Sequence, residues 1–402
     1  MGKILRAIKK IIPEPIFDFF SPVYHWILSL LAAVIYWFPS RRGRMKVIGV
    51  TGTSGKTTTV EFLYRIFTDA GFKTASLSGL WFRISDKSEP NLLKMTMPGR
   101  FRVHRFLYEA KKAGAEYVFI EVTSEGIKQY RHKFIKFYAA ILTNLSEEHL
   151  EAHGGFENYR RAKGEIFRIA PIVFLNGEDP NLEYFQKISP KEKIIYIASD
   201  YPPDLKLNLS GEFNKMNAVA ALAFAKREGV LPSVAKEALA KIPGIPGRME
   251  YVNPPARVKK DFRVLVDYAF LPQTLIKVYA QARSESSGLV CVLGTAGGGR
   301  DKWKRPLLGD IASEFCRKVF ITNEDPYDDD PVELMGEVAG DHKFEIILDR
   351  RQAIRLALEA IGPGETLVIT GKGAEPWIMG PDGSKIPWDD RRVVREEWEK
   401  IK

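Results

Sequence analysis

Residues 45–59 are Met-Lys-Val-Ile-Gly-Val-Thr-Gly-Thr-Ser-Gly-Lys-Thr-Thr-Thr, and this stretch decides the fold. An apolar run predicts a buried strand, a glycine-rich turn follows, and apolar residues then recur at helical spacing. Strand, glycine-rich loop and helix in this order favour phosphate binding, because backbone N–H groups and the positive helix end face the anion. The lysine can reach the outer phosphates, and the hydroxyl after it can bind Mg²⁺. We therefore predict a nucleotide site at Gly52, Thr53, Ser54, Gly55, Lys56, Thr57 and Thr58.

The loop departs from the strict phosphate-binding pattern at one position, because Val50 stands where that pattern has glycine. The alternative is a glycine turn without function. Gly55-Lys56-Thr57 lies between a predicted strand and a predicted helix, which is the context that the motif requires, so we favour the phosphate site.

The composition is that of a globular protein with a core: 402 residues, 45% hydrophobic, predict two or three domains. Residues 1–46 hold eight Lys or Arg and two acidic residues, so they carry +6 of the net charge of +10. The small remainder argues against a nucleic-acid partner for the folded body. Cys291 and Cys316 stand in apolar contexts and predict reduced core residues of a cytosolic protein.

Residues 1–44 form a separate segment. Residues 2–12 have the pattern of a basic amphipathic helix, and residues 23–38 are almost wholly apolar. Sixteen residues are short for a span, which needs about 20. Aromatic residues at both ends and arginines beyond them suit an interfacial anchor, whereas the alternative is a helix packed on the body. Both stay open, and we expect a cytoplasmic chain with membrane contact, through this segment, at the inner face of the cell membrane.

Two α/β domains are predicted beyond this segment. In residues 45–243, strands near 117–122, 138–143, 172–175 and 193–197 and a helix over 212–228 indicate a mainly parallel sheet. Pro243 and Pro246 indicate a linker. In residues 247–402, the strands are expected at 264–266, 289–293, 318–322, 345–348 and 366–370, with helices near 273–283, 306–316, 331–339 and 350–360. This second unit is Rossmann-like but lacks the dinucleotide fingerprint.

A second motif covers residues 143–167. His149 and His153 are four residues apart and would share one face of a helix, so a zinc pair and two solvated histidines are both open. The run Thr-Asn-Leu-Ser-Glu-Glu-His-Leu-Glu-Ala-His-Gly, followed by Tyr159 and Ala-Lys163, resembles a motif of the Mur ligase family. The glycine-rich loop resembles that of the same family. Its members are ATP-dependent, amide-forming enzymes of cell-wall precursor synthesis.

The resemblance implies a magnesium site in which Lys163 is carbamylated. Carbamylation turns a cation into an anionic oxygen ligand, and Lys56 would bind the phosphates. The alternative is a solvated helix lysine. The implied catalytic residues are Lys56, Glu121, His149 and Lys163, and the implied metal ligands are Thr57, Glu121, His149 and Lys163.

Further motifs extend the resemblance to about residue 390, closest to the UDP-N-acetylmuramoyl-tripeptide synthetase branch. They imply additional nucleotide-binding residues at Asn214, Arg248, Asp267, Arg300 and Lys304. They imply contacts with a UDP-muramoyl-peptide-like acceptor or an amino acid at Thr96, Thr123, Ser124, Arg131, Glu324, Asp325, Gly371 and Glu375. The reaction implied is activation of the acceptor carboxylate as an acyl phosphate, followed by attack of the amino acid.

Four departures matter. Glu125, Phe270 and Ala374 stand where the family has histidines, and the 44-residue segment stands where those enzymes hold the UDP end of the substrate. Two alternatives therefore stay open: a folyl- or poly-glutamate-forming ligase, and a membrane-tethered nucleotide-binding homologue without ligase activity.

The stretch Glu324-Asp325-Pro326-Tyr327 bears on the added amino acid. Diaminopimelate enzymes of the resembling branch carry arginine at the last of these positions, and three aspartates follow here at 328–330. An acidic loop suits an ammonium group, so we predict lysine before diaminopimelate. The alternative is that these aspartates solvate the loop and cap the helix starting near Pro331.

Overall fold

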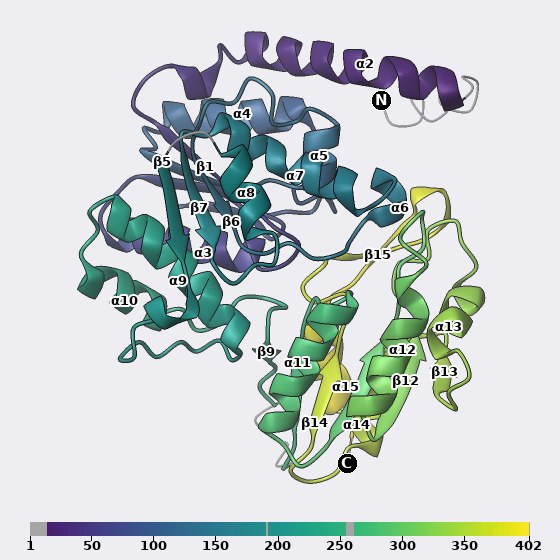
Figure 1. Ribbon diagram of the computed structural model, residues 1–402. Coiled ribbons are helices and arrows are strands. Elements are labelled where there is room, and N and C mark those ends of the chain that lie inside the picture. The colour runs from purple at the N-terminus through teal and green to yellow at the C-terminus, as the bar shows by residue number, and fades with distance from the viewer. Residues whose placement is uncertain (1–13, 190–191, 255–260, 402) are drawn as a thin grey trace.

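The structure is a computed structural model that describes residues 14–189, 192–254 and 261–401. Two α/β units follow one another, and helix α2 (Glu14–Ile35) lies across the side of the first unit that is remote from the second (Figure 1). The helix expected over residues 2–12 lies outside the described residues.

The first unit is built on an eight-stranded sheet in the order β4-β3-β2-β5-β1-β6-β7-β8. Strand β1 lies in the middle, is buried and pairs in parallel with β5 and β6, so the loop after it opens at the centre of the sheet edge. The strands are β1 (Lys46–Thr51), β2 (Thr74–Leu77), β3 (Trp81–Ile84), β4 (Lys87–Pro90), β5 (Tyr117–Glu121), β6 (Phe137–Leu142), β7 (Ile172–Asn176) and β8 (Glu192–Tyr196). The helices are α3 (Lys56–Asp69), α4 (Arg100–Lys112), α5 (Ser124–Lys128), α6 (Leu150–His153), α7 (Phe156–Ile169), α8 (Leu182–Ile188), α9 (Glu212–Arg227) and α10 (Pro232–Ala240).

The second unit has a six-stranded sheet in the order β13-β12-β11-β14-β10-β9, parallel except for β9. Its strands are β9 (Glu250–Tyr251), β10 (Arg263–Val266), β11 (Leu289–Leu293), β12 (Lys318–Thr322), β13 (Glu345–Ile347) and β14 (Thr366–Ile369). A hairpin of β15 (Trp377–Met379) and β16 (Lys385–Pro387) follows. The helices are α11 (Pro272–Ser284), α12 (Lys304–Phe315), α13 (Pro331–Ala339), α14 (Arg350–Ala360) and α15 (Asp390–Trp398). The predicted fold class, two α/β units with mainly parallel sheets, is confirmed.

The prediction of two reduced cysteines is wrong. Cys291 on β11 and Cys316, just after α12, form a disulfide, with 6.0 Å between their Cα atoms. Helix α12 crosses one face of the sheet and returns the chain beside β11, so two residues 25 apart in sequence meet in the same hydrophobic cluster. Both side chains are nevertheless buried, as their apolar contexts predicted.

Helix α2 packs on the body along one face. Ala32 and Ala33 are fully buried, α4 lies beneath the helix, and the Ser29 hydroxyl donates a hydrogen bond of 2.7 Å to the carbonyl oxygen of Tyr130. Of the helices in the described part of the chain, none combines the length and the apolar character needed to cross a bilayer. The inward face of α2 is therefore packed on the body, as the second of the two alternatives for this segment predicted.

Candidate active site

A cavity of about 1380 Å³ lies between the two units, at the carboxyl ends of the strands of the first sheet. Eighteen of the residues predicted from sequence line it: Thr53, Ser54, Gly55, Lys56, Thr57, Thr58, Thr96, Glu121, Thr123, Ser124, Arg131, His149, Lys163, Asn214, Arg248, Asp267, Arg300 and Glu375. Five predicted residues are not part of this lining: Gly52, Lys304, Glu324, Asp325 and Gly371.

The glycine-rich loop is held by the segment after β6. A Cβ atom on Gly52 would lie 1.9 Å from the Thr143 hydroxyl oxygen, so only glycine fits at this close approach. The Thr143 hydroxyl donates to the carbonyl oxygen of Ser54 at 2.6 Å, and the Ser54 N–H donates to the Asn144 side-chain oxygen at 3.0 Å. Sequence reasoning gave these two residues no role, although they begin the Thr-Asn-Leu run on which the resemblance rests.

Lys56 folds back over the loop. Its Nζ donates hydrogen bonds to the carbonyl oxygens of Gly52 and Thr53, each at 2.8 Å. The lysine begins α3, whose first N–H groups face the cavity with the loop, as expected for a phosphate cradle.

Lys163 on α7 is fully buried beneath the same loop. Its Nζ donates to the carbonyl oxygen of Gly52 at 2.7 Å and lies 4.8 Å from the centre of the Tyr159 ring. Burial holds the pKa of the Lys163 amine well below its usual range, and the nearby charge of Lys56 acts in the same direction, while Glu148 opposes it. The geometry therefore favours a neutral amine at position 163.

Glu121 ends strand β5 next to Thr57. It is buried, and its Oε1 accepts a hydrogen bond of 2.8 Å from the N–H of Gly79. Burial raises the pKa of Glu121, although Lys56 and hydrogen bonds from Gly79 and Thr57 act in the opposite direction. A hydroxyl and a carboxylate beside a phosphate loop are oxygen donors that Mg²⁺ prefers, with substrate phosphates and water completing its shell. Within the described ranges, no three His, Cys, Asp or Glu side chains gather as a metal site of their own.

His149 precedes α6 instead of lying within it, with φ of 55° in the left-handed region, so the argument from helical spacing does not apply to it. The rings of His149 and His153 nevertheless both lie near the Tyr159 ring, with 6.4 and 5.4 Å between centroids. The Nε2 atom of His149 lies 3.3 Å from Glu148 Oε1, and burial lowers the pKa of His149 while Glu148 opposes the shift. The N–H groups of Leu150 and Glu151 donate to the Asp301 carboxylate of the second unit, at 3.3 and 3.1 Å.

The predicted nucleotide-side residues are anchored mainly by the backbone. Asp267 accepts hydrogen bonds of 2.7 Å from the N–H groups of Met249 and Ala269, and thus holds the turn that carries Arg248. The Arg248 guanidinium lies 3.5 Å from the Thr57 hydroxyl, and the Asn214 amide donates to the carbonyl oxygen of Ser210 at 2.7 Å. Lys304 lies behind the wall, with its Nζ 4.7 Å from the centre of the Phe270 ring.

The predicted acceptor residues form the opposite wall. Thr123 caps α5 by accepting a hydrogen bond of 3.0 Å from the Gly126 N–H. The buried Arg131 guanidinium donates to Gln129 Oε1 at 2.6 Å and to the carbonyl oxygen of Met97. Among the residues that the structure describes, the hydrogen-bond acceptors of the Arg131 side chain are an amide oxygen and a backbone carbonyl oxygen. Burial lowers the pKa of Arg131, and the nearby charge of Glu125 opposes this shift.

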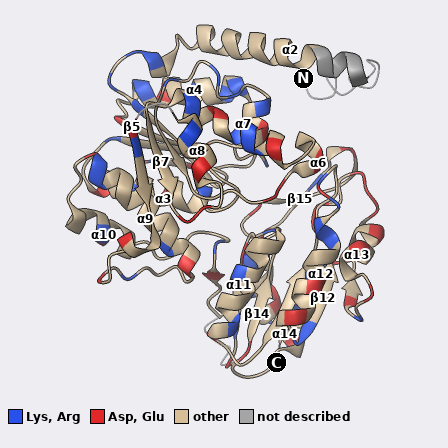
Figure 2. Ribbon diagram, in the orientation of Figure 1, with Lys and Arg blue, Asp and Glu red and all other residues tan. Residues whose placement is uncertain are grey.

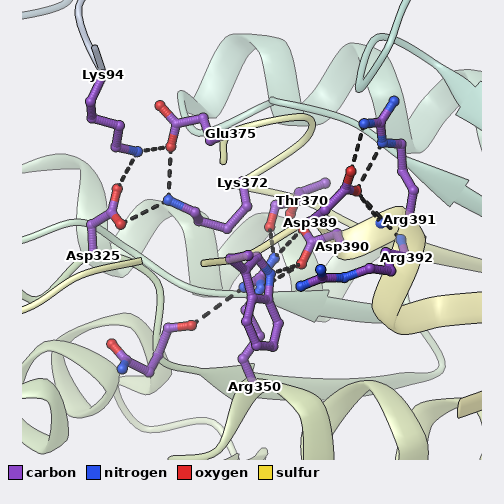
Figure 3. Close-up of polar contacts among 12 residues, drawn as sticks. Lys94, Asp325, Arg350, Thr370, Lys372, Glu375, Asp389, Asp390, Arg391 and Arg392 are labelled. Atoms are coloured by element: carbon purple, nitrogen blue, oxygen red, sulfur yellow. Dashed lines mark hydrogen bonds and ion pairs between the residues drawn. The ribbon is translucent and has the colours of Figure 1, made fainter. Parts of the chain in front are cut away.

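Four charged side chains join the two units beside the cavity (Figure 3). Lys94 of the first unit lies 2.6 Å from Asp325 Oδ2 and also contacts Glu375, both of the second unit. Lys372 lies 2.7 Å from Asp325 Oδ1 and 2.8 Å from Glu375 Oε2. Although burial acts in the opposite direction, the two lysines hold the pKa of Asp325 below its ordinary value. Sequence reasoning missed Lys94, because nothing in its neighbourhood indicates a partner some 230 residues away along the chain.

The aspartates after Pro326 have backbone partners. Asp328 accepts a hydrogen bond of 2.7 Å from the Asp382 N–H, and Asp329 accepts one of 2.9 Å from the Gly298 N–H. Asp330 caps α13 through the Val332 N–H at 2.8 Å. Asp330 therefore caps the helix as the alternative predicted, Asp328 and Asp329 bond other loops, and the choice of amino acid stays a prediction.

The fold and the site together define a two-unit α/β protein with a phosphate loop facing an inter-unit cavity. The Mur ligase middle domain model matches residues 50–202, and the Mur ligase, glutamate ligase domain model matches residues 247–373. The chain belongs to the Mur ligase family.

Relatives cover most of the chain. A UDP-N-acetylmuramoyl-L-alanyl-D-glutamate–2,6-diaminopimelate ligase of Syntrophomonas wolfei is 33% identical over 92% of this chain and 81% of its own. A UDP-N-acetylmuramyl-tripeptide synthetase of a Roseiflexus species gives the same values. A solved diaminopimelate ligase structure is similar at 26% identity, with a TM-score of 0.58 over 89% of this chain and 79% of that one. E. coli FolC in complex with ADP has a TM-score of 0.67 over 85% of this chain and 89% of that one, at 18% identity, which shows the fold alone.

Proposed function

We propose that this protein is an ATP-dependent ligase that adds an amino acid to the carboxylate of a UDP-muramoyl-peptide-type cell-wall precursor. The observation that carries the proposal is that Lys56, Glu121 and Lys163 of the first unit line the same cavity as Arg300 and Glu375 of the second. Relatives at 33% identity are named as ligases and synthetases of muramoyl peptides, which supports the same reaction class.

The first unit is assigned the phosphate chemistry. The loop N–H groups and Lys56 bind the phosphates of ATP, and Thr57, Glu121, His149 and a carbamylated Lys163 would hold Mg²⁺. The metal, when bound, supplies positive charge that offsets the charge developing on the transferred phosphoryl group. Thr57 and Glu121 are adjacent oxygen donors at the loop, which supports this assignment.

Carbamylation of Lys163 is supported by the state of its amine. A neutral amine attacks carbon dioxide, forming an N–C bond and releasing one proton, whereas an ammonium group has no lone pair for this step. The buried position lowers the pKa of Lys163 well below its usual range, which favours the neutral form over the ammonium form. Lys56 lies close enough to depress that pKa further and would pair with the carbamate once formed.

The two walls of the cavity are assigned the two other substrates. Arg131, Thr96, Thr123 and Ser124 hold the acceptor so that its carboxylate meets the terminal phosphate and becomes an acyl phosphate. An amino acid held on the side of Arg300 and Glu375 then attacks the acyl carbon, giving the amide and releasing phosphate. Charged contacts between the units, such as Lys94 with Asp325, support a mechanism that needs the units together.

Two further assignments belong to this proposal. The boundaries are a segment at 1–44, a nucleotide domain at 45–243 and a C-terminal domain at 247–402. Residues 1–44 give the protein contact with the inner face of the cell membrane, which the apolar run 23–38 and the arginines after it support.

Product analysis tests the proposal. The full chain is incubated with ATP, Mg²⁺, a panel of UDP-muramoyl peptides and a panel of amino acids, and the products are separated by mass spectrometry. We expect one ligated product and ADP, and a loss of several orders of magnitude in Lys56→Ala, because a charge-assisted phosphate contact is removed. Lys46→Ala, at the far end of β1, is the matched control. ATP binding without any ligated product would instead favour a homologue without ligase activity, and glutamylation of a folate would favour a folyl-type ligase.

A further inference from the structure

Helix α2 is inverted relative to an ordinary surface helix. Such a helix turns its apolar stripe inward and its polar residues outward. In α2 the fully buried residues are small or polar, namely Ser29, Ala32 and Ala33. The outward residues are large and apolar, with 46% to 57% of each exposed, and they recur at helical spacing: Val23, Ile27, Leu31, Val34 and Ile35. We call these five residues the outward stripe.

The inward face is fixed to the body, so the helix cannot turn the stripe inward. The Ser29 hydroxyl bonds the Tyr130 carbonyl oxygen at 2.7 Å. The Trp26 ring meets the Phe134 ring edge-on, with 5.6 Å between centroids. Figure 1 shows the whole helix lying along the outside of the first unit, above α4 and α5. The stripe therefore faces away from the described chain.

Charge indicates what covers the stripe. Residues 21–40 contain no Asp, Glu, Lys or Arg, and the exposed Arg41, Arg42 and Arg44 follow directly. Figure 2 shows this basic loop at the end of α2. An uninterrupted apolar face ending in arginines complements the acyl boundary and anionic headgroups of a lipid bilayer. Trp37, with 66% of its surface exposed beside the Arg42 guanidinium, suits the headgroup level.

We propose that α2 docks flat on an anionic bilayer, with the outward stripe among the acyl chains and the three arginines on the headgroups. This docking rests on the membrane contact proposed above. It adds which face of α2 makes the contact, how the helix lies on the bilayer and which class of lipid it meets. A spanning orientation is excluded for the packed helix, because lipid cannot surround a helix whose Ala32 and Ala33 are fully buried on the body. The stripe runs from Val23 to Ile35, which gives a contact about 20 Å long.

The inward side of the docked helix, opposite the outward stripe, lies next to the acceptor wall. His25 of α2 lies 2.7 Å from the Arg100 guanidinium, which donates to the carbonyl oxygen of Gln129 at 2.9 Å. Gln129 in turn accepts the hydrogen bond from Arg131 at the cavity. Residues 125–129 separate Tyr130, which α2 contacts, from the cavity residue Ser124 at the start of α5. Docking would therefore hold the acceptor end of the cavity close to the membrane surface.

Vesicle binding of the full chain tests the proposal. Co-sedimentation is measured with phosphatidylglycerol vesicles and with phosphatidylcholine vesicles, using Ile27→Gln with Leu31→Gln as the stripe variant. The matched control is Ile276→Gln with Leu231→Gln, the same two changes at residues exposed by 42% and 65% on α11 and before α10. We expect the stripe variant to bind phosphatidylglycerol vesicles at least roughly tenfold more weakly, and the control to bind like the parent. Each of Arg41→Gln, Arg42→Gln and Arg44→Gln should weaken binding by about fivefold at low salt.

Three outcomes would overturn the docking. Equal vesicle binding by the parent and the stripe variant would mean that another part of residues 1–44 makes the membrane contact. The docking by the outward stripe would then be wrong, whereas the membrane contact proposed for residues 1–44 would still hold. Equal binding to both lipids would remove the role of the arginines. A chain that ignores vesicles and forms dimers that the stripe variant abolishes would identify a second copy as the occupant. The ligation assay needs no vesicles, so its result is independent of all three, and circular dichroism confirms that each variant is folded.

Discussion

The amine of Lys163 donates its hydrogen bond to the carbonyl oxygen of Gly52, at 2.7 Å, so the buried lysine of α7 contacts the phosphate loop from below. The contact joins two motifs that lie 111 residues apart in the sequence. Because Lys56 lies over the same carbonyl oxygen, two lysines share one acceptor. Two ammonium groups in this position would repel one another, which is a physical reason for one of them to be neutral or carbamylated.

We predict that Lys163→Ala loses ligation by several orders of magnitude and that a small carboxylic acid in the buffer partly restores it. The acid would supply the anionic oxygen that the carbamate supplies in the parent. Carbon-13 NMR of enzyme equilibrated with labelled bicarbonate should show one carbamate signal that this variant lacks. Lys187→Ala, on the neighbouring α8, is the control and should keep both signal and activity. Full activity of Lys163→Ala would remove the lysine from the mechanism.

Local patterns predicted much of the fold. The strand, loop and helix at 45–59 and the strands Leu289–Leu293 and Lys318–Thr322 lie where the sequence put them, because buried parallel strands are continuous apolar runs between turn residues. Strand β4 was missed for the opposite reason. Its residues Lys87–Pro90 are all exposed and carry no apolar alternation, so pairing with β3, rather than its own sequence, makes it a strand.

The site was predictable where a motif carries it and not where tertiary contacts do. Lys56, Glu121 and Lys163 belong to motifs, and all three line one cavity. The pairing of Lys94 with Asp325 and the capping of α6 by Asp301 join residues of different units, and no local pattern specifies such partners. The left-handed backbone at His149 likewise broke an argument that assumed a regular helix.

Acid should destabilise the first unit through buried histidines. Burial lowers the pKa of His104, which has no exposed surface, from 6.5 to about 4. Between these values the unfolded chain binds a proton that the folded chain does not, so the stabilisation is complete above pH 6.5 and is lost as the pH falls towards 4. At pH 5 the difference is about 2 kcal/mol per such histidine.

Urea unfolding at pH 7 and pH 5 measures this effect. His104→Leu should lose less stability between the two pH values than the parent does. The control, Leu107→Ala, changes a fully buried residue of the same helix α4 without removing a titratable group, and should keep the parental pH dependence. An unchanged acid sensitivity in His104→Leu would assign the loss of stability to other groups, such as His132, which is equally buried.

Asp301 should couple closure of the two units to the position of His149. Its carboxylate accepts the N–H groups of Leu150 and Glu151, and the Lys302 N–H donates to Glu151 at 2.8 Å in return. Asp301→Ala removes the cap of α6, at a cost of about 1 kcal/mol, and with it a contact across the cavity. We expect a roughly tenfold loss of kcat/KM with a small change in Tm.

Asp349→Ala is the matched control for this change. Asp349 caps α14 by accepting the Gln352 N–H at 2.9 Å, wholly within the second unit. Its loss should lower Tm by a similar amount and leave kcat/KM near the parental value. If both variants lose activity equally, the effect of Asp301 is one of stability rather than closure.

The choice of amino acid can be separated from the role of Asp325. The acidic run 324–330 favoured lysine over diaminopimelate as the added amino acid, and that preference stays a prediction. In the structure, however, the aspartates at 328–330 accept hydrogen bonds from backbone N–H groups, and Asp325 is paired with two lysines. Lys94, Lys372, Asp325 and Glu375 form a junction between the units with two positive and two negative groups. This junction has no excess negative charge that would select an ammonium group.

We therefore predict that Asp325→Asn weakens the reaction with every amino acid by the same factor. After this change, Glu375 is the remaining carboxylate partner of both Lys94 and Lys372. Lys372 has no exposed surface, and an uncompensated buried charge costs several kcal/mol. The junction between the units should loosen, so kcat/KM should fall for lysine, ornithine, diaminopimelate and alanine alike when they compete at equal concentration. Lys94→Met with Asp325→Asn removes one charge of each sign and should recover part of the loss, whereas either single change should not. A loss confined to lysine and ornithine would instead mean that the Asp325 carboxylate contacts the side chain of the amino acid directly.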